Sequence, residues 1–119
     1  MKLKIDSVVD YGTHDSERVL LTVLEDCNLK NYQIADTTYN GEHSISNKLR
    51  HFYWFAPKDV KAGDKIILHT KRGRNSSTEL ANGKTQYTYY WGLGNFVWNN
   101  DGDAAVLFEV NNWNTTRVV

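Results

Sequence analysis

The sequence predicts an all-β protein, a sandwich of roughly 7–9 antiparallel strands, and three observations support this prediction. Apolar and polar residues alternate along many short segments, which is the period of a β-strand. Turn residues separate these segments at intervals of about 8–15 residues, a spacing typical of sandwiches and barrels. The one stretch compatible with a helix, residues 44–51, lacks a sustained apolar stripe.

The expected strands follow from local composition. Residues 18–24 are apolar on both faces, which favours a central strand. Residues 51–55 are rich in aromatic side chains, which suit a pleated surface better than a helix. In chain order, the predicted strands are 3–9, 18–24, 31–36, 51–55, 64–70, 85–91, 96–98, 104–110 and 112–118.

The residues between these strands are typical of turns. Asn40-Gly41, Asn82-Gly83 and Asp101-Gly102 are hairpin dipeptides, because both residue types tolerate a positive φ angle. The Gly-Asp pair within residues 61–64 predicts a further turn. Pro57 is expected to end the strand before it, since proline has no N–H to donate to a ladder.

Length and charge limit the possible functions. The 119 residues fit one domain, so we expect a single domain over residues 1–119. The 14 basic and 14 acidic side chains give a net charge of zero, so nothing draws the whole chain toward nucleic acid or a membrane. A site for a polyanion would have to be a local patch. Zero net charge also lowers the repulsion between copies, which favours self-association.

The cysteine count and the N-terminus predict the compartment. Cys27 is the sole cysteine, so neither an intramolecular disulfide nor a multi-cysteine metal site is expected. Residues 1–6 alternate charged and apolar side chains, which is not the pattern of a signal peptide. No stretch approaches the ~18 apolar residues of a membrane span. We therefore expect a cytoplasmic protein with no membrane segment.

Several segments match a known domain in their order along the chain. Residues 98–109 combine a tryptophan, a turn rich in Asn, Asp and Gly, and a strand with a leucine and an acidic residue. Upstream, the Phe-Ala-Pro of 55–57 precedes the strand entry of 60–68. Residues 19–21 form an apolar strand, and 29–36 place Leu, Tyr, Ile and Asp at matching intervals. Together these segments resemble the lamin tail domain.

The resemblance implies an immunoglobulin-like β-sandwich. Members of that family serve as appended binding or scaffolding modules, and a shared fold does not by itself define a function. The chain departs from the family pattern at four positions. Ala62 and Asp64 stand where Pro and Glu are usual, and Asn31 and Tyr32 stand where Gly and Trp are common.

The usual catalytic patterns are absent from the sequence. No Gly-x-Ser-x-Gly motif frames any serine, and no phosphate-binding glycine loop occurs. Residues 99–103 offer oxygen ligands of the kind that calcium prefers, but their spacing does not fit an EF-hand. We therefore predict a protein that is not an enzyme, with no cofactor and no metal. A small hydrolase is the least favoured alternative, and it would need a buried contact between a histidine and a carboxylate or Cys27.

One predicted surface combines basic and aromatic side chains. Cations at the end of the 64–70 strand precede a polar loop, and the 85–91 strand follows with tyrosines and a tryptophan on one face. Adjacent cations and rings can hold a phosphate while stacking on a base, or can stack on a sugar. The alternative is ordinary sheet packing beside a solvated face. The candidate surface is His69, Lys71, Arg72, Arg74, Tyr87, Tyr89 and Trp91.

The leading hypothesis is a non-catalytic binding or scaffolding module whose partner is a protein, including another copy of this chain. The edge strands, expected at residues 1–9 or 112–119, could pair with a strand of the partner. The alternative is a nucleic-acid- or carbohydrate-binding domain that uses the basic and aromatic surface.

Overall fold

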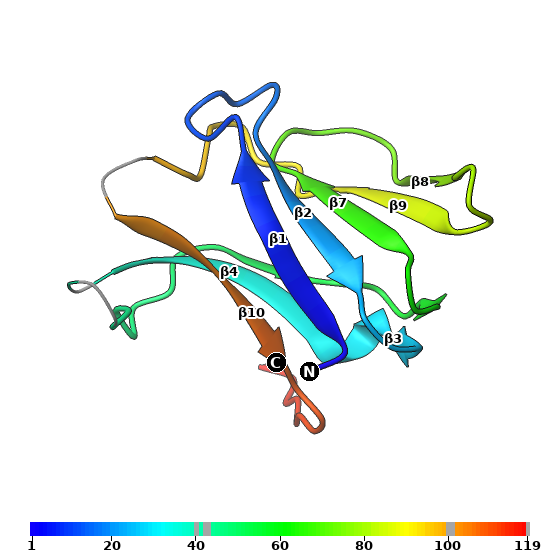
Figure 1. Ribbon diagram of the computed structural model, residues 1–119. Coiled ribbons are helices and arrows are strands. Elements are labelled where there is room, and N and C mark those ends of the chain that lie inside the picture. The colour runs from blue at the N-terminus through cyan, green and yellow to red at the C-terminus, as the bar shows by residue number, and fades with distance from the viewer. Residues whose placement is uncertain (40, 42–43, 100–101, 119) are drawn as a thin grey trace.

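The computed structural model describes residues 1–39, 41, 44–99 and 102–118 (Figure 1). These residues form ten strands and one short 3-10 helix, so the predicted all-β fold is confirmed. The elements are β1 (Leu3–Val9), β2 (Arg18–Val23), β3 (Cys27–Asn28), η1 (Leu29–Asn31), β4 (Tyr32–Thr38), β5 (Phe52–Trp54), β6 (Asp59–Val60), β7 (Lys65–His69), β8 (Ser76–Glu79), β9 (Thr85–Tyr90) and β10 (Asp103–Glu109).

Two larger sheets form the layers of the sandwich, and a two-stranded β3-β6 ladder lies beside them. The five-stranded sheet has the order β1-β2-β7-β9-β8, and the three-stranded sheet has the order β10-β4-β5. Figure 1 shows β4 and β10 in one layer and β1, β2, β7 and β9 in the other. At one end of each sheet, β1 and β10 are edge strands that no ladder joins.

One strand pair differs from the predicted, uniformly antiparallel arrangement. β7 and β9 are parallel, whereas every other described pair of strands is antiparallel. A parallel pair needs a crossover of about a dozen residues or more. Residues 70–84 provide it, because the chain leaves β7, forms β8 at the far edge and returns through a hairpin into β9. Gly83 makes that hairpin turn with a φ of 79°, as its Asn-Gly dipeptide predicts.

Two predicted strands are wrong, because residues 96–98 and 112–118 form no strand. Residues 44–51, which lack an apolar stripe, form no helix. The backbone N–H groups of Val97 and Trp98 donate to the carboxylate of Glu17 instead of to a neighbouring strand. The turns expected at Asn40-Gly41 and Asp101-Gly102 include positions outside the described residues.

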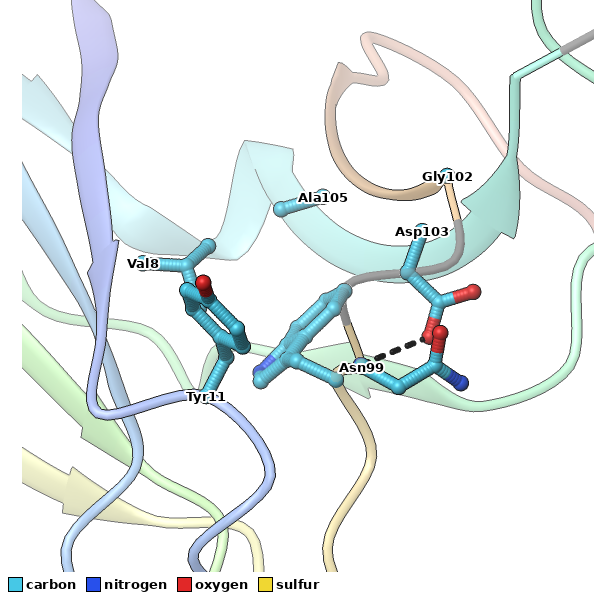
Figure 2. Close-up of a pocket in the computed structure, with 7 residues that line it drawn as sticks. Val8, Tyr11, Asn99, Gly102, Asp103 and Ala105 are labelled. Atoms are coloured by element: carbon cyan, nitrogen blue, oxygen red, sulfur yellow. Dashed lines mark hydrogen bonds between the residues drawn. The ribbon is translucent and has the colours of Figure 1, made fainter.

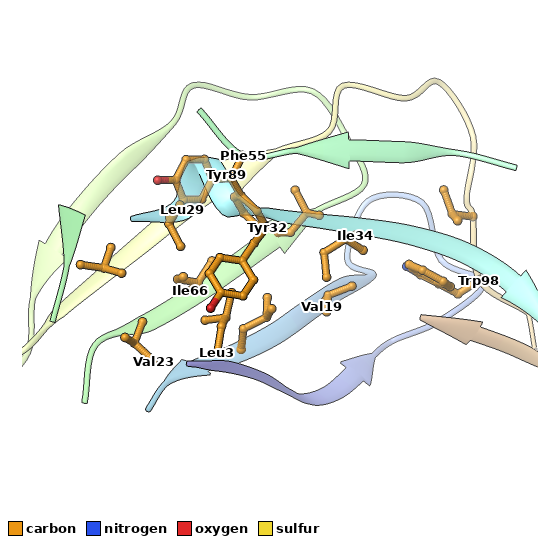
Figure 3. Close-up of a cluster of buried hydrophobic side chains, with 14 residues drawn as sticks. Leu3, Val19, Val23, Leu29, Tyr32, Ile34, Phe55, Ile66, Tyr89 and Trp98 are labelled. Carbon is orange, nitrogen blue, oxygen red and sulfur yellow. The ribbon is translucent and has the colours of Figure 1, made fainter. Parts of the chain in front are cut away.

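The core lies between the two larger sheets (Figure 3). Alternate residues of β2 point into it, which is why Val19, Leu21 and Val23 are buried and the residues between them are only half-buried. The fourteen buried core side chains are Leu3, Val19, Leu21, Val23, Leu29, Tyr32, Ile34, Phe55, Val60, Ile66, Leu68, Tyr89, Val97 and Trp98.

Candidate functional site

The aromatic part of the predicted surface faces the protein interior. The Cα atoms of Tyr87 and Tyr89 are in register with Ile66 and Leu68 of β7, whose side chains are buried. Tyr89 is only 8% exposed, and Tyr87 and Trp91 also pack against the core. These three rings therefore line the inner side of the five-stranded sheet.

Contacts between rings account for this packing. The ring of Tyr89 lies 5.2 Å from the Phe55 ring and 6.3 Å from the Tyr53 ring, both in edge-on geometry. Trp91 donates its indole N–H to the carbonyl of Phe52 across a 3.0 Å hydrogen bond. Burial raises the pKa of Tyr89 to about 12, so its hydroxyl stays neutral at any physiological pH. This part of the predicted surface joins the two layers.

The basic part lies at the end of β7. His69 stacks on Tyr90, with 4.9 Å between ring centroids and 12° between planes. Burial and the charges of Lys71 and Arg18 lower the pKa of His69, which favours the neutral imidazole. Arg72 and Arg74 follow in the loop and are exposed. The structure thus places His69 and Gly73, which lies between Arg72 and Arg74, against the Tyr90 ring, whereas the rings of Tyr87, Tyr89 and Trp91 pack against the core.

One exposed histidine, His51, contacts the buried carboxylate of Asp36, whereas the hydrolase hypothesis required a buried contact. Asp36 Oδ1 lies 3.0 Å from His51 Nδ1 and accepts the His51 backbone N–H at 2.7 Å. Among the described residues, no hydroxyl or thiol side chain is hydrogen-bonded to a histidine ring. His43 lies outside the described residues. Across the part of the chain that is described, no group of three or more His, Cys, Asp or Glu side chains could hold a metal ion.

A second set of aromatic residues covers the outward face of the three-stranded sheet. In β4, the side chains of Tyr32 and Ile34 point into the core, so those of Gln33 and Ala35 point outward. Gln33 pairs with Trp54 and Phe108 on its two sides, and Ala35 pairs with Phe52. Residues directly opposite in a ladder share a face, so these three rings face outward together.

These outward rings are ordered by contacts with one another. The rings of Phe52 and Phe108 lie 6.3 Å apart, and those of Trp54 and Trp113 meet edge-on at 4.9 Å. Trp54 also donates its indole N–H to the carbonyl of Lys30 at 2.7 Å. We call Phe52, Trp54, Phe108 and Trp113 the aromatic face. Sequence reasoning missed it, because residues 52–55 are four consecutive aromatic residues and their composition does not tell which rings are exposed.

A pocket of about 310 Å³ lies where the edges of the two sheets meet (Figure 2). Figure 2 shows Val8 and Tyr11 on one side and Asn99 and Asp103 on the other, with Ala105 between them. Asp103 accepts the backbone N–H of Asn99 at 3.0 Å. The pocket is lined by Val8, Tyr11, Trp98, Asn99, Gly102, Asp103 and Ala105.

Comparisons of the chain with protein-family models, with curated proteins and with solved structures return no match. Functional assignment therefore depends on the chemistry of the surfaces described above. As for a membrane, none of the described residues belongs to a helix with the length and apolar character needed to cross one.

Proposed function

We propose that this chain is a non-catalytic binding and scaffolding module with a lamin-tail-like sandwich, and that it associates with a second copy of itself through the aromatic face. The observation that carries this proposal is the exposure of Phe52, Trp54 and Trp113 together on one sheet face. Contiguous exposed apolar surface of this kind marks interaction sites. Phenylalanine and tryptophan are also enriched at the centres of protein interfaces.

Order in the unbound protein favours binding through these rings. The Trp54 ring is held by its hydrogen bond to the Lys30 carbonyl and by its contact with Trp113. A side chain that is already ordered loses little rotamer entropy when a partner covers it. Gln33, the half-buried outward residue of the central strand, is uncharged, and Ala35 is already buried, so a partner does not have to desolvate an ion there.

Charge favours a second copy as the partner. The chain carries no net charge, so two copies do not repel one another. Pairing through β1 is less favourable, because its register shifts between Ile5 and Ser7 and its Lys4 and Asp6 side chains form a 3.5 Å ion pair. Bulges and charges are features that protect an edge strand from pairing with another chain. A face-to-face contact around a two-fold axis would bury the same rings of both copies.

The lamin-tail-like assignment has support from the positions of its marker residues. Trp98 and Phe55 are both buried, and Leu107 packs against the core that they share. These residues belong to two of the segments, 55–68 and 98–109, that resemble that domain. The resemblance favours a scaffolding role, which fits a surface built for association and not for catalysis.

Light scattering coupled to size exclusion, over about 1 µM to 1 mM protein, tests the proposal. Phe52 and Phe96 form a matched pair, because their side chains are 51% and 45% exposed but only Phe52 lies on the aromatic face. We expect Phe52→Ser to weaken dimerisation about tenfold or more and Phe96→Ser to leave it unchanged. A wild-type chain that stays monomeric throughout, or equal weakening by both variants, would overturn it.

The basic group beside Tyr90 supports nucleic-acid binding as a second candidate function. Arg72 and Arg74 are exposed and flank Gly73, which lies against the Tyr90 ring of the His69–Tyr90 stack, an arrangement that can contact phosphate and base together. This candidate predicts that a single-stranded oligonucleotide binds at low salt and that affinity falls steeply as salt rises. Arg72→Ala with Arg74→Ala should remove that binding, whereas no binding at about 20 mM salt would exclude this candidate.

A further inference from the structure

We infer that the pocket between the edges of β1 and β10 binds a methylated ammonium group, carried by a small molecule or by a modified lysine side chain. This ligand site lies outside the aromatic face and does not depend on the proposed self-association. At about 310 Å³, the pocket is at the lower end of the range of ligand sites.

The lining of the pocket selects a cation with apolar surface. Tyr11 is 53% exposed and brings an aromatic ring whose face attracts a weakly hydrated cation, while Trp98, 2% exposed, also lines the pocket. Asp103 adds a carboxylate, and none of the described residues that line the pocket is a lysine, arginine or histidine. Val8 and Ala105 present methyl groups, which contact methyl or methylene groups better than they contact a hydrated metal ion.

One buried side chain holds both aromatic residues in place. Glu17 Oε1 accepts the backbone N–H of Gly12, next to Tyr11, at 3.0 Å and that of Trp98 at 3.4 Å. Gly12 has a φ of 82°, a conformation that glycine adopts without strain, so the loop carrying Tyr11 turns tightly beside Trp98. Glu17 therefore holds the backbone of the loop that carries Tyr11 next to the backbone of Trp98.

The carboxylate of Asp103 has unused binding capacity. Within the described chain, Asp103 forms no ion pair, and its described hydrogen bond uses Oδ2 only. A ligand cation would provide the opposite charge for this carboxylate.

Titration of the full chain with tetramethylammonium, choline and Nε-trimethyllysine amide tests the inference. Binding is followed by the indole N–H resonances in proton–nitrogen NMR spectra. The control ligand is 3,3-dimethyl-1-butanol, a neutral molecule of the same shape as choline. We expect the Trp98 resonance to shift when the cations are added. The affinity for the neutral alcohol should be at least about tenfold lower than the affinity for choline. Tighter binding of choline than of trimethyllysine amide would identify a small molecule as the source of the methylated ammonium group. Tighter binding of trimethyllysine amide would identify a modified lysine side chain.

Variants of the lining keep the test independent of folding. Tyr11→Phe should retain binding, Tyr11→Ala should weaken it about tenfold, and Asp103→Asn should weaken the cations but not the alcohol. Tyr39→Ala, which changes an exposed tyrosine outside the pocket, should have no effect. The inference is wrong if no cation binds at about 100 mM, if the alcohol binds as well as choline, or if Tyr11→Ala binds like the wild type.

Discussion

The carboxylate of Glu17 accepts a 2.5 Å hydrogen bond from the hydroxyl of Thr70, and both side chains are removed from solvent. The same carboxylate binds three backbone N–H groups, those of Gly12, Val97 and Trp98. A buried carboxylate is costly unless it is fully hydrogen-bonded. Here its four partners join the loop after β1, the end of β7 and the segment before β10.

Replacing this carboxylate by an amide should therefore destabilise the fold. In Glu17→Gln, one oxygen becomes an NH₂ group that faces donors and cannot accept from them. We expect the free energy of unfolding to fall by about 3 kcal/mol, measured from urea denaturation. Glu79→Gln, which changes an exposed residue of β8, should shift it by less than about 0.5 kcal/mol. Equal stability of the two variants would show that the Glu17 network contributes little.

The role of Glu17 marks a limit of what a sequence can predict. A glutamate between Ser16 and Arg18 has the composition of a solvated turn, and nothing local indicates that residues 97 and 98 come back to it. The strands were predictable where one face is buried, as in β2, because alternation is a local pattern. Residues 96–98 have the composition of a strand, yet the N–H groups of Val97 and Trp98 donate to Glu17.

The sequence predicts which residues alternate along the strand of the candidate surface, but not which side of that strand is buried. Alternation placed Tyr87, Tyr89 and Trp91 on one side of a strand, which the structure confirms. Which side is buried depends on the parallel pairing of β9 with β7, a contact set by the crossover through β8. The same limit applies to Phe52 and Trp54, whose exposure follows from the register with β4.

Truncation of Trp91 should act on stability. Its ring contacts Tyr53 and Trp98, and its indole N–H is bonded to the Phe52 carbonyl. We expect Trp91→Ala to cost about 2–3 kcal/mol in chemical denaturation, below the range for fully buried aromatics because this ring is half-buried. Trp113→Ala removes an exposed ring and should cost about 1 kcal/mol or less. Wild-type stability of Trp91→Ala would show that the ring contributes little to packing and would again make it a candidate for ligand binding.

The packing of Gly73 against the Tyr90 ring, which stacks on His69, provides a third test. A Cβ atom added at Gly73 would lie 2.3 Å from Tyr90 ring atoms, whereas one at Gly94 would meet nothing within 4 Å. Neither glycine has a positive φ, so the comparison isolates the steric effect. We expect Gly73→Ala to lower the free energy of unfolding by about 1–3 kcal/mol. Gly94→Ala should leave it unchanged or slightly raise it. Thermal denaturation of both variants measures the difference, and a stable Gly73→Ala would mean that the Tyr90 ring moves aside freely.

Acid should weaken the fold through His69. Burial, with Lys71 and Arg18 nearby, lowers the pKa of His69 below its ordinary value of 6.5, so the unfolded chain binds the proton more readily than the folded one. The stabilisation is thus fully present above pH 6.5 and is lost as the pH falls from there through the folded pKa. His69→Phe keeps a flat ring for Tyr90 to stack on but cannot titrate. We expect the wild type to lose more stability than His69→Phe between about pH 7 and pH 5 in urea denaturation. Parallel curves for the two proteins would show that His69 titrates alike in the folded and unfolded states.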